Sequence, residues 1–216
     1  DGKWYKINYT WKNARSSDVK FYLDPSNFDQ KSTAFYQFVK LSASAGLDPD
    51  EVNEKILKDK GILKGHAQDF IDAAKKYNIN EIYLISHALL ETGNGTSTLA
   101  TGYTINGKKV YNMYGIGAKD SCPITCGAQY AYDHKWFTVR DAIIGGAQFV
   151  SQDWIHAGQD TLYKMRWNPA GAEKYGYATH QYATDIGWAV KQTSEIVKLY
   201  GLLNNYTLIF DVPKYK

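Results

Sequence analysis

The sequence predicts a mainly helical domain of the α+β class, with a small β-lobe beside a cleft. Two observations lead to this prediction. Apolar residues recur at spacings of three and four through most of the chain, which is typical of helices that bury one face. Glycines gather in residues 101–136, where short apolar runs flank the Asn106-Gly107 pair that favours a β-hairpin turn. With 216 residues, the chain is long enough for one sizeable core.

The first quarter of the chain is predicted to combine an extended arm with short helices. Aromatic or apolar residues alternate with polar ones in residues 1–24, which predicts a strand or an extended arm. Residues 35–41 present one apolar face at helical spacing. Asp48 is followed by Pro49, which predicts a helix with Asp48 as its N-cap and the proline in its first turn.

Two further helices are predicted in the middle of the chain. One runs through about residues 70–77. Asn80 opens the next, which covers Glu81–Glu91 and carries an apolar stripe. Glycines at positions 93 and 95 follow it, and glycine is the residue most often found where a helix ends.

After the β-lobe, the chain is predicted to return to helices. Thr138 and Asp141 form a capping-box pattern at the start of one helix. The last helix is expected at about residues 186–200. The tail at 206–212 is strand-like, and we expect it to pair with the N-terminal arm.

Composition narrows the classes of function. The formal net charge is +3 and the basic residues are dispersed, so we expect no nucleic-acid partner. No apolar run approaches the roughly 18 residues that span a bilayer, so we expect no membrane insertion. Aromatic residues make up 15%, and tyrosine and tryptophan offer flat apolar faces with a polar edge that suit sugar rings. The abrupt start at Asp1 predicts a mature form or an excised catalytic domain.

The chain has two cysteines, Cys122 and Cys126, with a proline between them. This spacing favours a small disulfide loop in an exported protein. A zinc site would need further ligands, and only His134 lies near in the sequence. A cysteine nucleophile is the alternative, although nothing in the sequence marks either thiol as activated. We expect no metal and no cofactor.

Glu91 has the most suggestive sequence position of the acidic residues. It follows an apolar stretch and ends a predicted helix, where the helix dipole disfavours negative charge. Apolar neighbours also raise the pKa of a carboxyl group. Both effects favour the protonated form, which a general acid acting on a glycosidic oxygen requires. The alternative is a solvated glutamate at a helix end. His87, one turn earlier, is expected to be a core histidine whose nitrogens are satisfied.

Three segments resemble the signatures of bacterial autolysin glucosaminidases, glycoside hydrolase family 73. They are residues 90–97 (LETGNGTS), 112–116 (NMYGI) and 181–185 (QYATD), in the family's order. Residues 146–149 (GAQF) and 162–169 (LYKMRWNP) are similar to the autolysin branch of that family. The resemblance covers about residues 65–200 and is specific as a set. It divides the chain into an N-terminal arm and helical addition (1–60) and a catalytic domain (61–216).

The resemblance implies a lysozyme-like helical lobe and a β-hairpin lobe that flank a substrate cleft. It implies an endo-β-N-acetylglucosaminidase that hydrolyses the bond after N-acetylglucosamine in peptidoglycan, a monomer, secreted or associated with the bacterial cell wall. The family's acid corresponds to Glu91 and its active-site tyrosine to Tyr182. Predicted substrate-binding residues are Asn112, Tyr114, Gly115, Gln181 and Trp167. Core packing is an equal alternative for Trp167.

The second catalytic group is open at this point. Asp120 is the best positional candidate for a second carboxylate, and a turn cap is the alternative role for it. A separation of about 5–5.5 Å from Glu91 would fit a nucleophile, and about 6.5–9.5 Å a base that activates water. A third route uses the N-acetyl oxygen of the substrate itself.

Other functions compete with this prediction. A lytic transglycosylase or a muramidase would act on the same polymer with a similar fold, because one fold can host several reactions. A cysteine peptidase would depend on Cys122 or Cys126. A peptidoglycan-binding module without catalysis would leave Glu91 as a surface residue.

Overall fold

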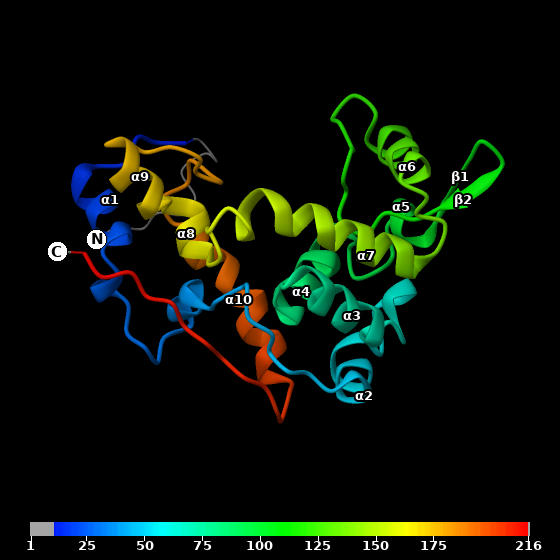
Figure 1. Cartoon of the computed structure of the whole chain (residues 1–216), viewed down its shortest axis with the longest axis horizontal. Helices are drawn as coiled ribbons and strands as arrows, with labels where there is room; N and C mark the ends of the chain where they lie inside the picture. The colour runs from blue at the N-terminus through cyan, green and yellow to red at the C-terminus, as the bar shows by residue number, and fades with distance from the viewer. Residues whose placement is uncertain (1–10, 216) are drawn as a thin grey trace.

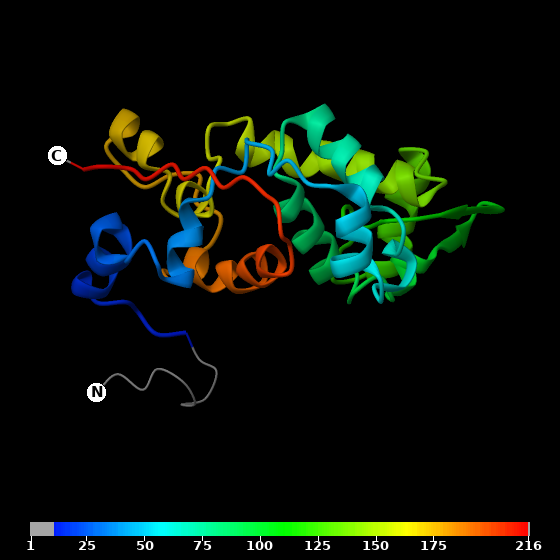
Figure 2. The ribbon, with the colours of Figure 1, turned by 90° about the horizontal axis from the view of Figure 1, so that it is seen from below.

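A computed structural model describes residues 11–215 of the chain (Figures 1 and 2). Its α-helices are α1 (Ser16–Leu23), α2 (Pro49–Val52), α3 (Ala67–Tyr77), α4 (Glu81–Glu91), α5 (Thr98–Thr101), α6 (Pro123–Asp133), α7 (Val139–Val150), α8 (Leu162–Trp167), α9 (Pro169–Tyr175) and α10 (Trp188–Gly201). Short 3-10 or π-helical turns are η1 (Pro25–Asn27), η2 (Thr33–Phe38), η3 (Asn53–Leu57), η4 (Gly61–Leu63) and η5 (Ser151–Ile155). Strands β1 (Tyr103–Ile105) and β2 (Lys108–Val110) form an antiparallel hairpin. The mainly helical fold class is confirmed.

The predicted helix starts are confirmed in atomic detail. The Asp48 side chain accepts a hydrogen bond from the amide of the third helical residue, 2.9 Å away. Asn80 does the same for Tyr83 at 3.1 Å. Thr138 and Asp141 form the reciprocal capping box. Each cap satisfies amides that have no partner inside the helix, which explains why these short polar residues mark helix starts so reliably.

The predicted β-lobe is only partly β. Asn106 and Gly107 form the hairpin turn, both with positive φ (50° and 74°), as this tight turn requires. Residues 123–133, however, form helix α6. The glycine content of the region suggested turns, but Gly127, Ala128 and Ala131 lie on one buried face of α6. Small residues at helical spacing therefore pack this helix closely.

The expectations for the chain ends are partly wrong. Residues 1–10 lie outside the described residues, and residues 16–23 form helix α1 rather than an extended arm. The strand-like tail does pair, but with the segment after η2. Phe210 and Val39 form an isolated antiparallel bridge, and the Lys40 amide donates to the Ile209 carbonyl at 2.8 Å.

The described chain has a large core and a smaller satellite core. In Figure 1 the hairpin and α6 lie at one end of the molecule, and α1, α8 and α9 lie at the other. The satellite core joins aromatic side chains of residues 28–38 to two from α8, and its members are Phe28, Phe35, Phe38, Tyr163 and Trp167. Element η2 also packs against α10. Residues 28–38 are therefore packed against the C-terminal half of the fold.

Helix α4 lies in the middle of the molecule (Figures 1 and 2). Its buried apolar side chains lie along one face of the helix and belong to the large core, Ile82, Leu84, Ile85, Ala88 and Leu89. Packing of this face against the core holds the helix in place. This rigid helix ends on Glu91, so the core fixes where that carboxyl group lies.

Candidate active site

The Glu91 carboxyl group lies at the C-terminal end of α4 without a strong partner. Its side chain is 40% exposed and accepts no hydrogen bond from the residues described. The nearest ionisable group is His87, with Nε2 3.7 Å from Glu91 Oε1. Burial raises the pKa of Glu91 above its ordinary value. The raised pKa increases the protonated fraction of Glu91 at any given pH, which is the direction that its sequence position predicts.

His87 lies one turn before Glu91 and is uncharged at neutral pH. Burial lowers the pKa of His87 to about 4, so the close contact with Glu91 is not an ion pair. The expectation of a satisfied core histidine is wrong in one respect. The Nδ1 atom is buried and lacks a hydrogen-bond partner among the described residues. Without a cation beside it, Glu91 keeps its raised pKa.

Gly115 brings the loop at 112–116 against Glu91. A Cβ atom at Gly115 would lie 3.2 Å from Glu91 Oε2, and the φ of +63° also favours glycine. This close approach explains the glycine of the predicted signature. The loop backbone thus forms one side of the space around the carboxyl group.

Asn112 and Tyr114 hold this loop from inside. The Asn112 side chain donates to the carbonyls of Ile116 (2.8 Å) and Gly127 (3.2 Å), and it accepts from two loop amides. Its four hydrogen-bonding positions are thus taken by backbone groups. The Tyr114 ring is buried, edge-on to His87 at 5.5 Å between centroids. The structure places neither side chain where the predicted sugar contacts would need it.

Tyr182 approaches Glu91 from the other end of the sequence. It lies in the irregular segment between α9 and α10, with 44% of its surface exposed. Its ring stacks on Trp188 (centroids 4.5 Å apart, planes 25° apart) and contacts Trp154. Burial raises the pKa of Tyr182, and the charge of Glu91 raises it further. The acid and the tyrosine of the predicted site are therefore brought together.

Glu91 and Tyr182 line one cavity of about 780 Å³ between α4 and α10. Its wall also includes Lys60, Tyr83, His87, Leu90, Asn94, Trp188, Lys191, Gln192, Glu195 and Lys198. The sequence did not predict that α10 lines this cavity. The helix has a polar face of lysines, glutamine and glutamate that could have indicated it, but such a face is usually only solvated.

None of the five predicted substrate-binding residues lines this cavity, Trp167 and Gln181 included. Trp167 is buried in the satellite core, so the core alternative describes it. Gln181 accepts from Arg166 Nη1 at 3.0 Å and donates to the Trp167 carbonyl at 3.3 Å. Both residues support the segment that carries Tyr182 rather than the cavity itself.

Asp120 and the cysteines lie in the connection between β2 and α6. Asp120 is exposed and is not among the residues that line the cavity with Glu91. A disulfide joins Cys122 to Cys126 at the start of α6, as predicted. Neither sulfur is then available as a thiolate nucleophile, which removes the basis for the cysteine-peptidase alternative.

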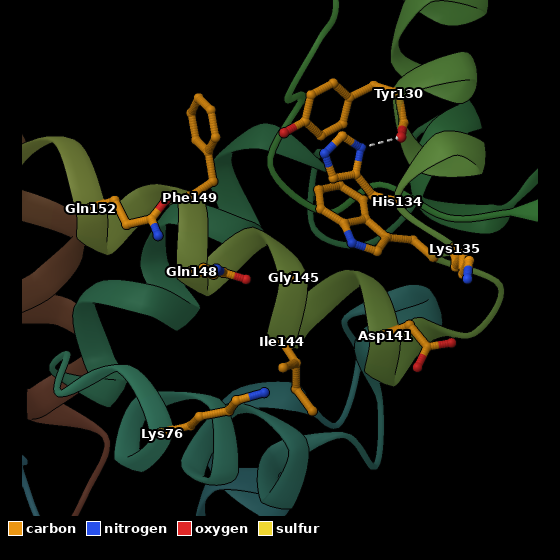
Figure 3. A pocket seen from close by; sticks show the side chains of 11 residues that line it. Lys76, Tyr130, His134, Lys135, Asp141, Ile144, Gly145, Gln148, Phe149 and Gln152 are labelled. Atoms are coloured by element: carbon orange, nitrogen blue, oxygen red, sulfur yellow. Dashed lines mark hydrogen bonds between the residues drawn. The ribbon is translucent and has the colours of Figure 1, made fainter.

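A second groove, of about 500 Å³, follows the outer face of α7 between α3 and α6 (Figure 3). None of the predicted site residues lines it. Within residues 11–215, no group of three or more histidine, cysteine, aspartate or glutamate side chains is placed to hold a metal ion. In the same part of the chain, no helix combines the length and apolar character needed to cross a membrane.

Comparison with known proteins agrees with this geometry. The family model for glucosaminidase (mannosyl-glycoprotein endo-beta-N-acetylglucosaminidase) matches residues 67–201, more than half of the chain. A beta-N-acetylglucosaminidase of Bacillus subtilis (strain 168) is 60% identical over 99% of this chain and 24% of that protein. A bifunctional autolysin of Staphylococcus epidermidis is 43% identical over 95% of this chain and 16% of its own. The chain thus spans a quarter or less of these relatives.

Solved structures are similar along almost the whole chain. The crystal structure of Major Bifunctional Autolysin has a TM-score of 0.84 and 43% identity, covering 98% of this chain and 87% of that one. A catalytic mutant of S. aureus Autolysin E, in which alanine replaces a glutamate, was solved with the disaccharide NAG-NAM. It has a TM-score of 0.68 and 34% identity over 94% of this chain and 85% of its own. The chain belongs to the glucosaminidase family, the family of autolysin glucosaminidases that its three signature segments resemble.

Proposed function

We propose that this chain hydrolyses the β-1,4 bond after N-acetylglucosamine in peptidoglycan glycan strands, with Glu91 as the general acid. The observation that carries the proposal is the pairing of Glu91 and Tyr182 in one cavity of a glucosaminidase-family chain. The family relatives include a beta-N-acetylglucosaminidase. Autolysin E, a structural neighbour, was solved with a muropeptide and with NAG-NAM. A wall polymer as substrate implies action outside the cytoplasm.

In the first step, Glu91 donates its proton to the glycosidic oxygen as the bond from C1 to that oxygen breaks. The raised pKa supplies the protonated carboxyl that this step needs. A half-exposed position at a helix end gives a polymer access to the carboxyl group. After the leaving sugar departs, the Glu91 carboxylate accepts a proton from the incoming water, and the acid is restored.

For the second role, we propose the N-acetyl group of the substrate, oriented by the Tyr182 hydroxyl. The N-acetyl oxygen bonds to C1 as the leaving group departs, and water then breaks that bond and restores the N-acetyl group. Tyr182 supports this route because it lines the same cavity as Glu91 and is 44% exposed, so that its neutral hydroxyl can donate a hydrogen bond to the N-acetyl group. Glu195, the other carboxylate of the cavity, lies 3.3 Å from Lys198 and is paired with it.

The first experiment digests purified peptidoglycan with wild type and with Glu91→Gln, and identifies the new ends by mass spectrometry after borohydride reduction. We expect reduced N-acetylglucosamine ends from wild type and almost none from the variant. Anhydro ends would identify a lytic transglycosylase, and reduced muramic acid ends a muramidase. If neither protein produced new ends although both were folded, the proposed hydrolysis would be refuted in favour of a binding module.

Asp120→Asn tests the second role directly. Because Asp120 is exposed and outside the cavity wall, we expect the variant to keep activity close to that of wild type. A loss as large as that of Glu91→Gln would instead make Asp120 the second carboxylate. The anomeric configuration of the product, followed by NMR, gives an independent check, since participation of the N-acetyl group retains the configuration.

A further inference from the structure

The segment that carries Tyr182 lacks regular secondary structure and must be held by other means. It covers residues 176–187, between α9 and α10. One backbone contact anchors its centre, the Tyr182 amide to the Met165 carbonyl at 2.9 Å. Before Tyr182, Gln159 Nε2 donates to the His180 carbonyl at 3.0 Å and Asn168 Nδ2 donates to the Thr179 carbonyl at 2.8 Å. The precise placement of the Tyr182 ring therefore depends on side chains packed under the segment.

Arg166 supplies three hydrogen bonds to this segment from one guanidinium group. Nη1 donates to the Gln181 side-chain oxygen at 3.0 Å. Nη2 donates to the Thr184 carbonyl at 3.3 Å, and Nε donates to the Asp185 carbonyl at 2.7 Å. These acceptors lie on both sides of Tyr182 in the sequence. The planar fork of arginine can therefore fix the segment at two places at once.

The surroundings of Arg166 argue against a simple ion-pair role. The residue is only 4% exposed, and its guanidinium lies over the Trp167 ring at 4.1 Å. All three acceptors are uncharged, and the carboxylate of Asp185 is instead 2.5 Å from Lys191. No described carboxylate lies within ion-pair distance of Arg166. Burying a charge against neutral acceptors is costly, so directed hydrogen bonding is the feature that an apolar residue could not replace.

We propose that Arg166 is a positioning residue for Tyr182, whose fork sets the position of the phenol relative to Glu91. This inference rests on the proposed function, in which Tyr182 contacts the substrate. Lysine at this position would keep the positive charge but offer a single donor centre. Arg166→Lys is therefore expected to release one side of the segment and to misplace the phenol.

The test compares Arg166→Lys, Tyr182→Phe and the double variant in the peptidoglycan assay. We expect Arg166→Lys to lower kcat by about 10- to 100-fold with a smaller change in KM, because a displacement near 1 Å can cost that much. In the Tyr182→Phe background, the same replacement should have little further effect, since the hydroxyl it positions is gone. Equal losses in both backgrounds would overturn the proposal, as would an unchanged kcat.

A matched control separates positioning from general loss of an arginine. Arg140 also has two acceptors, since it pairs with Asp69 and Asp72, but it lies outside the cavity wall. Arg140→Lys should keep activity within about twofold of wild type, as expected for a surface substitution. Gln181→Met removes only one of the three acceptors of Arg166. We expect this variant to fold normally and to lose less kcat than Arg166→Lys.

Hydrogen exchange tests the clamp without substrate. We expect the Tyr182 amide, which donates to Met165, to exchange faster in Arg166→Lys while amides of α4 keep their wild-type protection. Unchanged exchange at Tyr182 would refute the clamp even if activity fell. If wild type failed to cleave peptidoglycan, the proposed function would fail, and the exchange result would still decide whether Arg166 holds the segment.

Discussion

Helix α4 begins and ends with a glutamate, and the two carboxylates have opposite surroundings. Glu81, in the first turn, is 3% exposed. It accepts from the Ser44 hydroxyl at 2.5 Å and from the Ala45 amide at 2.6 Å. The positive end of the helix dipole also favours its charge. Glu81 is therefore a structural carboxylate that ties the segment before α2 to the central helix.

Glu91, one helix length away, has none of these partners. It is half exposed, lies at the negative end of the dipole, and faces a neutral His87. Ten residues at about 1.5 Å per residue place the two backbone positions about 15 Å apart along the same helix. The comparison shows that burial alone does not indicate a catalytic carboxylate. The indication comes from an unsatisfied carboxyl group at the unfavourable end of a helix, open to a cavity.

The same substitution at the two ends should have opposite consequences. Glu91→Gln removes the donated proton, and we expect activity to fall by about 10²- to 10⁴-fold, the usual contribution of a general acid. The release of reducing ends from peptidoglycan measures this loss, and circular dichroism verifies the fold. Residual activity above a tenth of wild type would mean that Glu91 is not the acid.

Glu81→Gln should instead reduce stability and spare catalysis. Replacing the two charge-assisted hydrogen bonds and the favourable end charge should lower the free energy of unfolding by about 1–3 kcal/mol. Urea denaturation measures this change, and activity per folded molecule should stay close to wild type. In the double variant Glu81→Gln and Glu91→Gln, the loss of stability and the loss of activity should be independent of each other. The two sites are too far apart to couple. A large loss of activity in folded Glu81→Gln would contradict the assignment of Glu81 as a structural carboxylate.

The pH dependence of activity tests the proposed role of Glu91 in a second way. In the proposed mechanism the acid form of Glu91 is the active form, so activity should fall as pH rises through the raised pKa of this group. Tyr182 stays protonated through that range because its pKa is also raised. A pH profile of kcat/KM measures this descending limb, and the residual activity of Glu91→Gln should lack it. A descending limb of the wild-type profile at the ordinary pKa of glutamate would contradict the raised pKa of Glu91.

The smallest expected effect is that of Glu91→Gln on the free energy of unfolding. A carboxyl with a raised folded-state pKa adds stability below its unfolded pKa, and this contribution is lost as pH rises through the folded pKa. At neutral pH, Glu91→Gln should therefore be as stable as wild type or slightly more so, within about 0.5 kcal/mol because the group is half exposed. Thermal unfolding at neutral and acidic pH measures the difference. A clear destabilisation by Glu91→Gln would mean that the Glu91 carboxyl group makes stabilising contacts, which the structure does not show among the described residues.

Much of the fold could be predicted because it depends on local hydrogen bonds. Asp48, Asn80 and Thr138 cap helices within three residues of themselves, and Asn106-Gly107 forms the hairpin turn. Helix α6 was missed because glycine and alanine content does not distinguish a closely packed helix from a loop. The start of α1 was missed because the alternation of the preceding residues was extended too far along the chain.

The candidate site divides in the same way. The sequence by itself identified Glu91 as the candidate acid, through its position after the apolar run of α4 and the resemblance of residues 90–97 to a family signature. Only the tertiary structure decided that Tyr182 lines the same cavity as Glu91, that Asn112 and Tyr114 are buried, and that Trp167 lies in a core. The physical reason is the separation along the chain of the residues that interact. Local spacing determines which backbone groups a residue can reach, whereas cavity walls depend on the packing of segments that are far apart in the chain.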